Sequence, residues 1–299
     1  MPIRTWILAA TAMLALASAT GAAAQQQCSL AVQPAEDQWI IRYDPFAGDA
    51  LQRQFDVSVV NVGDRPCAGA VRAELAGEEY GLRSVDGRER IPYALVDERH
   101  GADITPRTGA NAPRLNAHPV ALRPGERALL RFTFAADPTG TPSRGLYSQN
   151  VRLLLEHANG LMAGEHPITL ALEVAPAAAI GLKGQFQRSN GVARIELGEL
   201  SPGPRPLTAA LYVMSTGGYR LSIRSANNGR LRLGTTDWYV DYTMGLGDRR
   251  FDLESPGSID VVSTRARSDD YPLSIDIGSV SGRRAGEYTD VVTFTVAAL

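Results

Sequence analysis

The chain has 299 residues, 44% of them apolar and 21% charged, which is typical of a folded globular protein and excludes a disordered or fibrous one. Its 30 basic and 32 acidic residues leave a formal net charge of -2, so it lacks the basic excess expected of a nucleic-acid-binding protein. The length suggests two domains, although an all-β fold can reach roughly 250 residues as one unit.

Residues 1–24 have the pattern of a secretory signal peptide. Arg4 supplies a positive charge, residues 7–20 form an apolar run, and the small residues Ala22 and Ala24 precede Gln25 at the positions that a signal peptidase reads. The apolar run is shorter than the roughly 20 residues that span a bilayer. We therefore expect an exported protein without a membrane anchor.

Cys28 and Cys67 are the two cysteines of the sequence. Export would place them in an oxidising environment, where two cysteines without a third are expected to form a disulfide. In the chain-entropy model such a bond stabilises the fold by on the order of 3 to 4 kcal/mol. A catalytic thiol or a metal ligand would need a CxxC motif or a nearby histidine cluster, and the sequence has neither.

Apolar and polar residues alternate over many short segments, which predicts β-strands with one buried face. Turn-forming residues separate these segments at short intervals, and beyond residue 24 no segment has the periodicity of an amphipathic helix. The sequence therefore predicts antiparallel β-sandwiches. The clearest alternating segments are residues 55–59, 129–134, 168–174, 221–223, 273–277 and 292–296.

An internal repeat divides the chain. Residues 145–151 and 286–292 share the pattern G-x-Y-[ST]-x-x-V, and each copy introduces a predicted strand. A weaker match relates residues 91–95 to 240–244. Two related domains in tandem are expected, one at 25–175 and one at 176–299, joined by a short linker at 175–179.

Short motifs occur in a fixed order along the chain: an early cysteine, a Y-x-P segment, a second cysteine after a strand, a Y-x-L strand, and a last strand introduced by G-x-Y-[ST]-D. They are found at Cys28, 43–45, Cys67, 93–95 and 286–296. In this order they resemble the spore coat protein U domain family, the subunit fold of archaic chaperone-usher pili. The sequence departs from the family pattern at Gln149, where the family favours Asp, and in the absence of cysteines from the second half.

The resemblance implies an all-β fold of two tandem immunoglobulin-like sandwiches, the second of which lacks its final strand. A neighbouring subunit would supply that strand by β-strand addition. On this reading Val292, Phe294 and Val296 line the groove that accepts the donor strand. The first sandwich differs, because the alternating run at 168–174 can complete it from within.

A shaft subunit of such a pilus carries a donor segment ahead of its first cysteine, whereas here only Gln25, Gln26 and Gln27 lie between the predicted cleavage site and Cys28. The resemblance thus implies a non-enzymatic tip adhesin that accepts a strand and donates none. Its expected partners are a periplasmic chaperone, an outer-membrane usher, a neighbouring pilus subunit and a surface receptor. The expected location is the periplasm and then the fimbrium at the cell surface.

A long turn-rich segment at 100–119 is the candidate receptor-contacting loop, because long ordered loops in compact domains are often functional. A plain flexible connector is the alternative interpretation. Aromatic residues near 238–242 offer a second alternative, a sugar-binding face. The candidate receptor residues are His100, Arg107, Asn111, Arg114 and Asn116.

The sequence contains none of the common catalytic motifs, and we expect no enzymatic activity, no cofactor and no metal ion. The histidines His100, His118, His157 and His166 are too widely spaced for a local metal-binding motif. Two other functions stay open. One is a free-standing exported binding protein with two complete sandwiches, and the other is a pilus chaperone, which also has two immunoglobulin-like domains.

Overall fold

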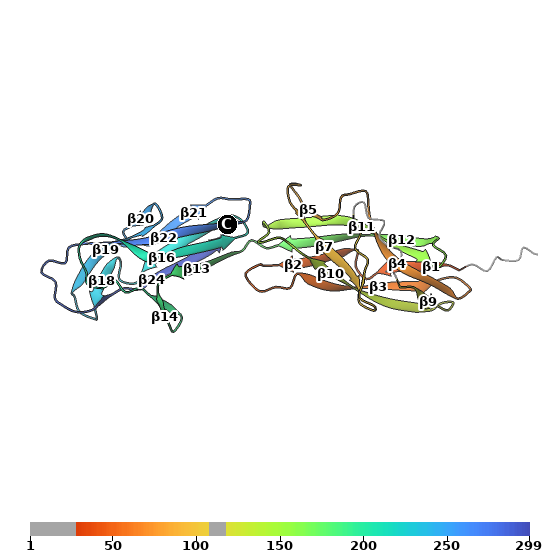
Figure 1. Ribbon diagram of the computed structural model, residues 1–299, viewed down its shortest axis with the longest axis horizontal. Helices are drawn as coiled ribbons and strands as arrows, with labels where there is room; N and C mark the ends of the chain where they lie inside the picture. Colours follow the sequence, from red (N-terminus) through yellow and green to blue (C-terminus); the bar gives the residue numbers. More distant parts are fainter. Residues whose placement is uncertain (1–27, 108–117) are drawn as a thin grey trace, which may run out of the picture.

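A computed structural model describes residues 28–107 and 118–299 of the chain. These residues form strands, turns and irregular connections without a helix, arranged as two all-β lobes placed end to end (Figure 1). In this part of the chain no helix is long and apolar enough to cross a membrane. The predicted signal peptide, residues 25–27 and the predicted receptor residues Asn111, Arg114 and Asn116 lie outside the described residues.

The first lobe is a sandwich of two sheets. All neighbouring strands pair antiparallel except β2 and β12, which pair in parallel. One sheet has the order β1 (Leu30–Pro34), β3 (Gln52–Asn61), β10 (Arg127–Ala136), β7 (Tyr93–Asp97), β8 (Ala102–Asp103). The other has the order β2 (Gln38–Tyr43), β12 (Met162–Val174), β11 (Gly145–His157), β4 (Cys67–Leu75), β9 (Val120–Leu122), with β5 (Leu82–Ser84) and β6 (Arg90–Ile91) beside β11.

The second lobe is also an antiparallel sandwich. One sheet has the order β13 (Ala178–Gly184), β16 (Gly203–Ser215), β22 (Arg267–Ile277), β19 (Tyr239–Leu246), β18 (Arg230–Leu233), β23 (Tyr288–Thr289), with β20 (Arg249–Phe251) on β19. The other has the order β21 (Gly257–Val261), β17 (Tyr219–Ser225), β24 (Val292–Ala298). A hairpin of β14 (Gln187–Ser189) and β15 (Val192–Arg194) projects from this lobe, and its strand residues are all exposed.

Each sandwich has its own core, built by the alternation seen in the sequence. In the first core Phe132 is fully buried, and the rings of Trp39 and Phe55 stack with their centroids 4.8 Å apart. In the second core Tyr219 and Leu221 are buried. All the alternating segments singled out in the sequence are strands, and the predicted all-β fold of tandem antiparallel sandwiches is confirmed.

The sequence repeat corresponds to the same strand position in both sandwiches. Tyr147 donates a hydrogen bond to Ser143 O (2.9 Å), and Tyr288 donates one to Arg284 O (2.8 Å). A tyrosine bonded to the backbone a few residues upstream marks the corner before the sixth strand of immunoglobulin-like sandwiches. In the first lobe this strand is β11, which pairs with β4 and β5, and in the second it is β23 with β24, which pair with β18 and β17.

Hydrogen bonds connect the two lobes near the segment between β12 and β13. Thr216 donates from its backbone N to Ala177 O (3.0 Å), and its carbonyl accepts from Arg144 N (2.8 Å). Ala266 N donates to Ser143 Oγ (3.1 Å). The turn between β16 and β17 therefore contacts both the linker and the first sandwich.

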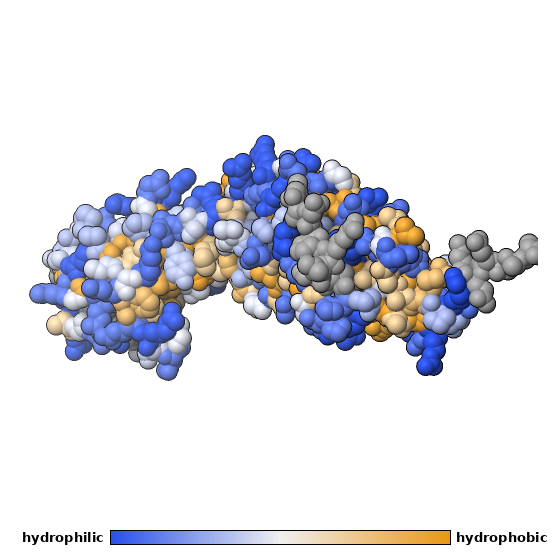
Figure 2. All heavy atoms as spheres, turned by 45° about the vertical axis from the view of Figure 1, so that its right-hand side comes forward, coloured by the Kyte–Doolittle hydropathy of each residue, from blue (hydrophilic) through white to orange (hydrophobic). Residues whose placement is uncertain are grey.

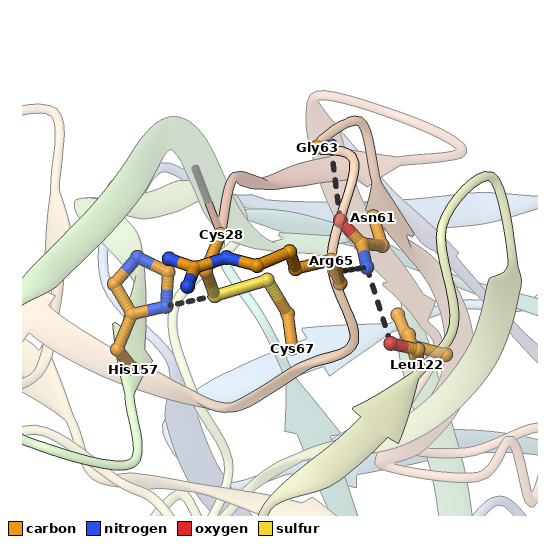
Figure 3. Close-up of a disulfide and its surroundings, with 7 residues drawn as sticks. All are labelled: Cys28, Asn61, Gly63, Arg65, Cys67, Leu122 and His157. Carbon is orange, nitrogen blue, oxygen red and sulfur yellow. Dashed lines mark hydrogen bonds between the residues drawn. A yellow bond between two sulfur atoms is a disulfide. The ribbon is translucent and has the colours of Figure 1, made fainter. Parts of the chain in front are cut away.

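The predicted disulfide between Cys28 and Cys67 is present, with the two Cα atoms 5.5 Å apart (Figure 3). It ties the beginning of the first sandwich to the start of β4. The buried Asn61 side chain holds the turn before Cys67, because its Nδ2 donates to Arg65 O (2.7 Å) and Leu122 O (3.1 Å). A disulfide is typical of a protein that folds in an oxidising compartment.

Candidate functional site

The sixth strand of the first sandwich has a neighbour on each edge. β12 lies between β11 and β2, and its residues Ile168, Leu170 and Leu172 are 2%, 0% and 0% exposed. These side chains complete the core from within the chain.

Among the described residues, the sixth strand of the second sandwich has a neighbouring strand on one edge only. Within residues 118–299, β24 pairs with β17, and no strand pairs with its opposite edge. By the sequence repeat Val292, Phe294 and Val296 occupy the positions of Val151, Leu153 and Leu155. The three residues of the first sandwich are at most 1% exposed, whereas those of β24 are half-buried.

The residues predicted to line the donor-strand groove thus lie together on the core-facing side of β24. Their partners on β17 are fully buried: Phe294 is opposite Ile223, and Val296 is opposite Leu221. Across this sheet, the core-facing side chains are buried on β17 and become partly exposed on β24, which is the strand with the open edge. We name the core-facing residues of β24, Val292, Phe294 and Val296, together with the backbone that carries them, the open edge.

The backbone of these same residues is turned away from β17. Ala226 N donates to Val291 O (2.9 Å), so Val291 directs its carbonyl toward the chain of β17. Leu299 N donates to Gly218 O (2.9 Å), so Leu299 directs its N–H toward the same chain. Because the direction alternates from residue to residue in an antiparallel pair, the even-numbered residues between them direct N–H and C=O outward. The open edge therefore offers apolar side chains and hydrogen-bonding groups from one set of residues.

The edge strand β13 has the same character on its outer side. Gln185 N donates to Thr208 O (2.8 Å) and Thr216 N to Ala177 O, which turns the intervening even-numbered residues outward. Among these, Ile180 and Leu182 are half-buried against the second core. β13 lies close to β24 without a ladder of hydrogen bonds. Figure 2 shows apolar residues gathered along the middle of this lobe between hydrophilic margins.

Asp290 fixes the start of β24. Its Oδ2 accepts from Tyr242 Oη (2.6 Å) and from Ser225 Oγ, and its Oδ1 accepts from Asn227 N (3.0 Å) and Val291 N (2.7 Å). Burial, together with the hydrogen bond to this carboxylate, raises the pKa of Tyr242. The sequence motif pointed to this aspartate but gave no sign of its partners, which come from β17, β19 and the turn after β17.

In the first sandwich, Gln149 occupies the position that Asp290 has in the second. Its side-chain amide holds the backbone of a neighbouring segment by hydrogen bonds. The side chain is buried, its Oε1 accepts from Gly81 N (3.0 Å), and its Nε2 donates to Glu79 O. Gln149 therefore anchors the backbone as Asp290 does in the second sandwich, but through different partners.

The two predicted receptor residues that the structure describes belong to separate contacts. The ring of His100 contacts that of His118 in a tilted arrangement, with centroids 4.1 Å apart. Arg107 Nη2 forms an ion pair with Asp103 Oδ2 (2.8 Å). Receptor contact by this loop stays a prediction.

The aromatic residues that were the alternative candidate for a sugar-binding face lie in different environments. Tyr242 is buried against Asp290, whereas Trp238 is exposed. In the described parts of the chain, no group of three or more His, Cys, Asp or Glu side chains is arranged to hold a metal ion.

No protein-family model and no curated protein matches the sequence, so the similarity to the spore coat protein U family stays an expectation. Solved structures with a similar arrangement include a chain of the CsuC–CsuE chaperone–tip adhesion subunit complex from the archaic chaperone-usher Csu pili of Acinetobacter baumannii. It is 13% identical, with a TM-score of 0.45, and the match covers 89% of this chain and 99% of that chain.

Two further matches come from enterotoxigenic Escherichia coli. The CooA pilin subunit is 12% identical with a TM-score of 0.36, over 50% of this chain and 99% of that chain. The CFA/I adhesin CfaE is 11% identical with a TM-score of 0.33, over 89% of this chain and 93% of that chain. At these identities and TM-scores the matches do not identify a function, which is inferred below from the chain's own geometry.

Proposed function

We propose that the chain is a non-enzymatic subunit of a chaperone-usher pilus that accepts an extended strand along the open edge of its second sandwich. The observation that carries the proposal is the contrast between half-buried Phe294 on β24 and fully buried Leu153 at the same position of β11. The order of short motifs in the sequence supports it independently.

Strand addition would satisfy both features of the open edge at once. An added strand would accept and donate the outward backbone hydrogen bonds of β24, and its inward side chains would cover Val292, Phe294 and Val296. Full burial of an apolar side chain contributes about 1.5–3 kcal/mol, so completing the burial of three side chains that are already largely buried is worth about 1 to 2 kcal/mol in total. An uncovered edge of this kind would otherwise favour aggregation.

The finer roles follow from this geometry and the family resemblance. The first sandwich is completed by its own β12 and needs no donated strand, which suits the receptor-binding domain of a tip adhesin. The periplasmic chaperone would cover the open edge first, and the neighbouring subunit would then replace it at the outer-membrane usher. A surface receptor would contact the first sandwich.

The chain's own β12 provides a donor for the test. A copy of residues 166–175 is appended after Leu299 through a short Gly/Ser linker, so that it can fold back along β24 as β12 does along β11. The matched control carries Leu170→Ser and Leu172→Ser in the appended copy. Thermal unfolding is followed for the unfused protein and both fusions.

The apolar copy is expected to raise the melting temperature of the second sandwich by roughly 5 °C, because about 1 kcal/mol shifts the transition of a domain slightly longer than 100 residues by about 4 °C. The serine control is expected to melt with the unfused protein. Identical transitions for both fusions would rule out strand addition at β24 and leave a free-standing binding protein as the better account.

A further inference from the structure

In the first sandwich, the strand that completes the core is paired on both sides. β12 pairs antiparallel with β11 and in parallel with β2, so that its last residue, Val174, lies between Gly145 and Tyr43. The open edge of β24 offers an added strand only the first of these two contacts. A segment of the second sandwich equivalent to β2 would supply the other.

The pairing of the first strand in each sandwich locates that segment. β1 begins opposite Asn61, the last residue of β3, and β13 begins opposite Ser215, the last residue of β16. The two strands therefore occupy equivalent positions. After β1 the chain crosses to the other sheet and forms β2. β13 ends at Gly184, and there the chain forms the hairpin of β14 and β15 instead.

The hairpin lies where β2 lies in the first sandwich. β13 and β24 are edge strands of the two sheets and lie close together, so an added strand would occupy the gap between them. Arg194, the last residue of β15, forms an ion pair with Glu287 (2.6 Å), just ahead of β23 and β24 (Figure 1). By the sequence repeat Glu287 corresponds to Leu146, which lies opposite Glu173 of β12 and, beyond it, Arg42 of β2.

The hairpin is held closed only weakly. Its strands form three residue pairs around a turn at Asn190 and Gly191, both of which have positive φ. All its strand residues are exposed, and the side chains of Arg194 and Glu287 are each more than half exposed. A two-stranded hairpin on its own is marginally stable in water, and an exposed ion pair adds little. Opening this hairpin therefore costs little free energy.

The two ends of the hairpin segment suit such a movement. Gly184 has a φ of +110°, and a Cβ atom there would collide with Thr208 O, so the chain turns out of β13 at a residue that tolerates unusual backbone angles. Phe186 follows it and is half-buried, with the guanidinium carbon of Arg188 5.8 Å from its ring centroid. In the first sandwich the aromatic residue after the crossing, Trp39 on β2, is 1% exposed.

We propose that the β14–β15 hairpin is the resting form of a second strand-pairing segment. When a strand is added along β24, the hairpin opens about Gly184, and residues 186–190 pair in parallel with the added strand as β2 pairs with β12. The inference rests on the proposed function and gives the neighbouring subunit's strand a second partner in this chain. New backbone hydrogen bonds and the burial of Phe186 replace the three residue pairs of the hairpin.

A disulfide across the hairpin tests whether it must open. Arg188 and Ala193 form the pair next to the one that closes the two-residue turn. In such a hairpin this is the non-hydrogen-bonded pair, in which the two residues approach most closely. The variant R188C/A193C, oxidised and with the Cys28–Cys67 disulfide intact, is locked closed. The matched control R188S/A193S can open. Binding of a peptide with the sequence of residues 166–174 is measured by fluorescence anisotropy.

The locked variant is expected to bind the peptide about three- to tenfold more weakly than the serine control, because the peptide pairs with β24 but not with residues 186–190. Hydrogen exchange is then compared between the unfused protein and the fusion that carries residues 166–175 after Leu299. Exchange in the fusion is expected to slow at 186–190 and to quicken at 192–194, because β15 loses its partner. The fusion with Leu170→Ser and Leu172→Ser in the appended copy is expected to exchange like the unfused protein.

The outcomes separate this inference from the proposed function. If the locked variant binds the peptide as tightly as the control, or more tightly, strand addition stands and the opening of the hairpin is wrong. The same conclusion follows if the fusion raises the melting temperature but leaves exchange in the hairpin unchanged. If the control binds no peptide and the fusion is not stabilised, strand addition at β24 fails, and this inference fails with it.

Discussion

The two sandwiches share one strand pattern but differ in what lies beside the sixth strand. Leu153 on β11, which has β12 beside it in the sheet, is fully buried, and Phe294 at the same repeat position on β24 is half-buried at an open edge. Both residues are large, apolar and core-facing. The comparison teaches that the burial of an alternating strand is decided by its neighbour in the sheet, which the strand's own sequence does not encode.

The largest expected effect tests whether the two sandwiches unfold independently. Replacing Cys28 and Cys67 by serine removes the disulfide that closes the first sandwich. We expect a loss of about 3 to 4 kcal/mol in the free energy of unfolding of that sandwich, because the unfolded chain gains conformational entropy. Denaturant unfolding followed by hydrogen exchange of each lobe measures it. An equal loss in the second lobe would show that the lobes unfold as one unit.

Truncating the equivalent side chains tests the comparison directly. Leu153→Ala is expected to cost about 3 kcal/mol, because it leaves a cavity in a closed core. Phe294→Ala, in the isolated protein, is expected to cost only about 1 to 2 kcal/mol, because the ring is half-buried. Chemical denaturation of both variants gives the values. Equal costs would contradict the assignment of β24 as an open edge.

The smallest expected effect concerns pH and the second sandwich alone. The guanidinium of Arg267 donates to Asp269 and lowers the pKa of that carboxyl, and Tyr219 Oη also donates to it (2.7 Å). A carboxyl with a lowered folded pKa stabilises the fold at pH above its unfolded value of 3.8, and this contribution is lost as pH falls from 3.8 toward the folded value.

Because Asp269 is partly exposed, its contribution is expected to be below about 1 kcal/mol. Between pH 5 and pH 3, the melting temperature of the second sandwich is expected to fall less in Asp269→Asn than in the unchanged protein, and that of the first sandwich is expected to fall equally in both. A changed pH dependence of the first sandwich in the variant would contradict this assignment.

Local patterns were sufficient to predict much of the fold. The alternation of apolar and polar residues predicted the strands, and the short spacing of turn residues predicted sandwiches. The expected export of a chain with two cysteines predicted the disulfide. The position of β12 was harder, because its parallel pairing with β2 joins residues such as Leu170 and Trp39, which are far apart in the sequence. Alternation shows that a strand has a buried face but does not identify the strands on either side.

The candidate site was predictable to the same extent. Val292, Phe294 and Val296 could be identified from alternation and the repeat, because a β-strand places every second side chain on one face. The carboxylate network of Asp290 could not, since Ser225, Asn227 and Tyr242 reach it from separate segments.

The strands of both lobes run mostly along the length of the molecule, and β24 ends beside the turn that is bonded to the linker (Figure 1). A pulling force between the far ends of the molecule would therefore act along β24 and along any strand paired with it. Hydrogen bonds of an antiparallel ladder lie perpendicular to the strands, so such a force loads them all in shear at once. A fibre joint built in this way would resist tension far better than one whose bonds could be peeled apart singly.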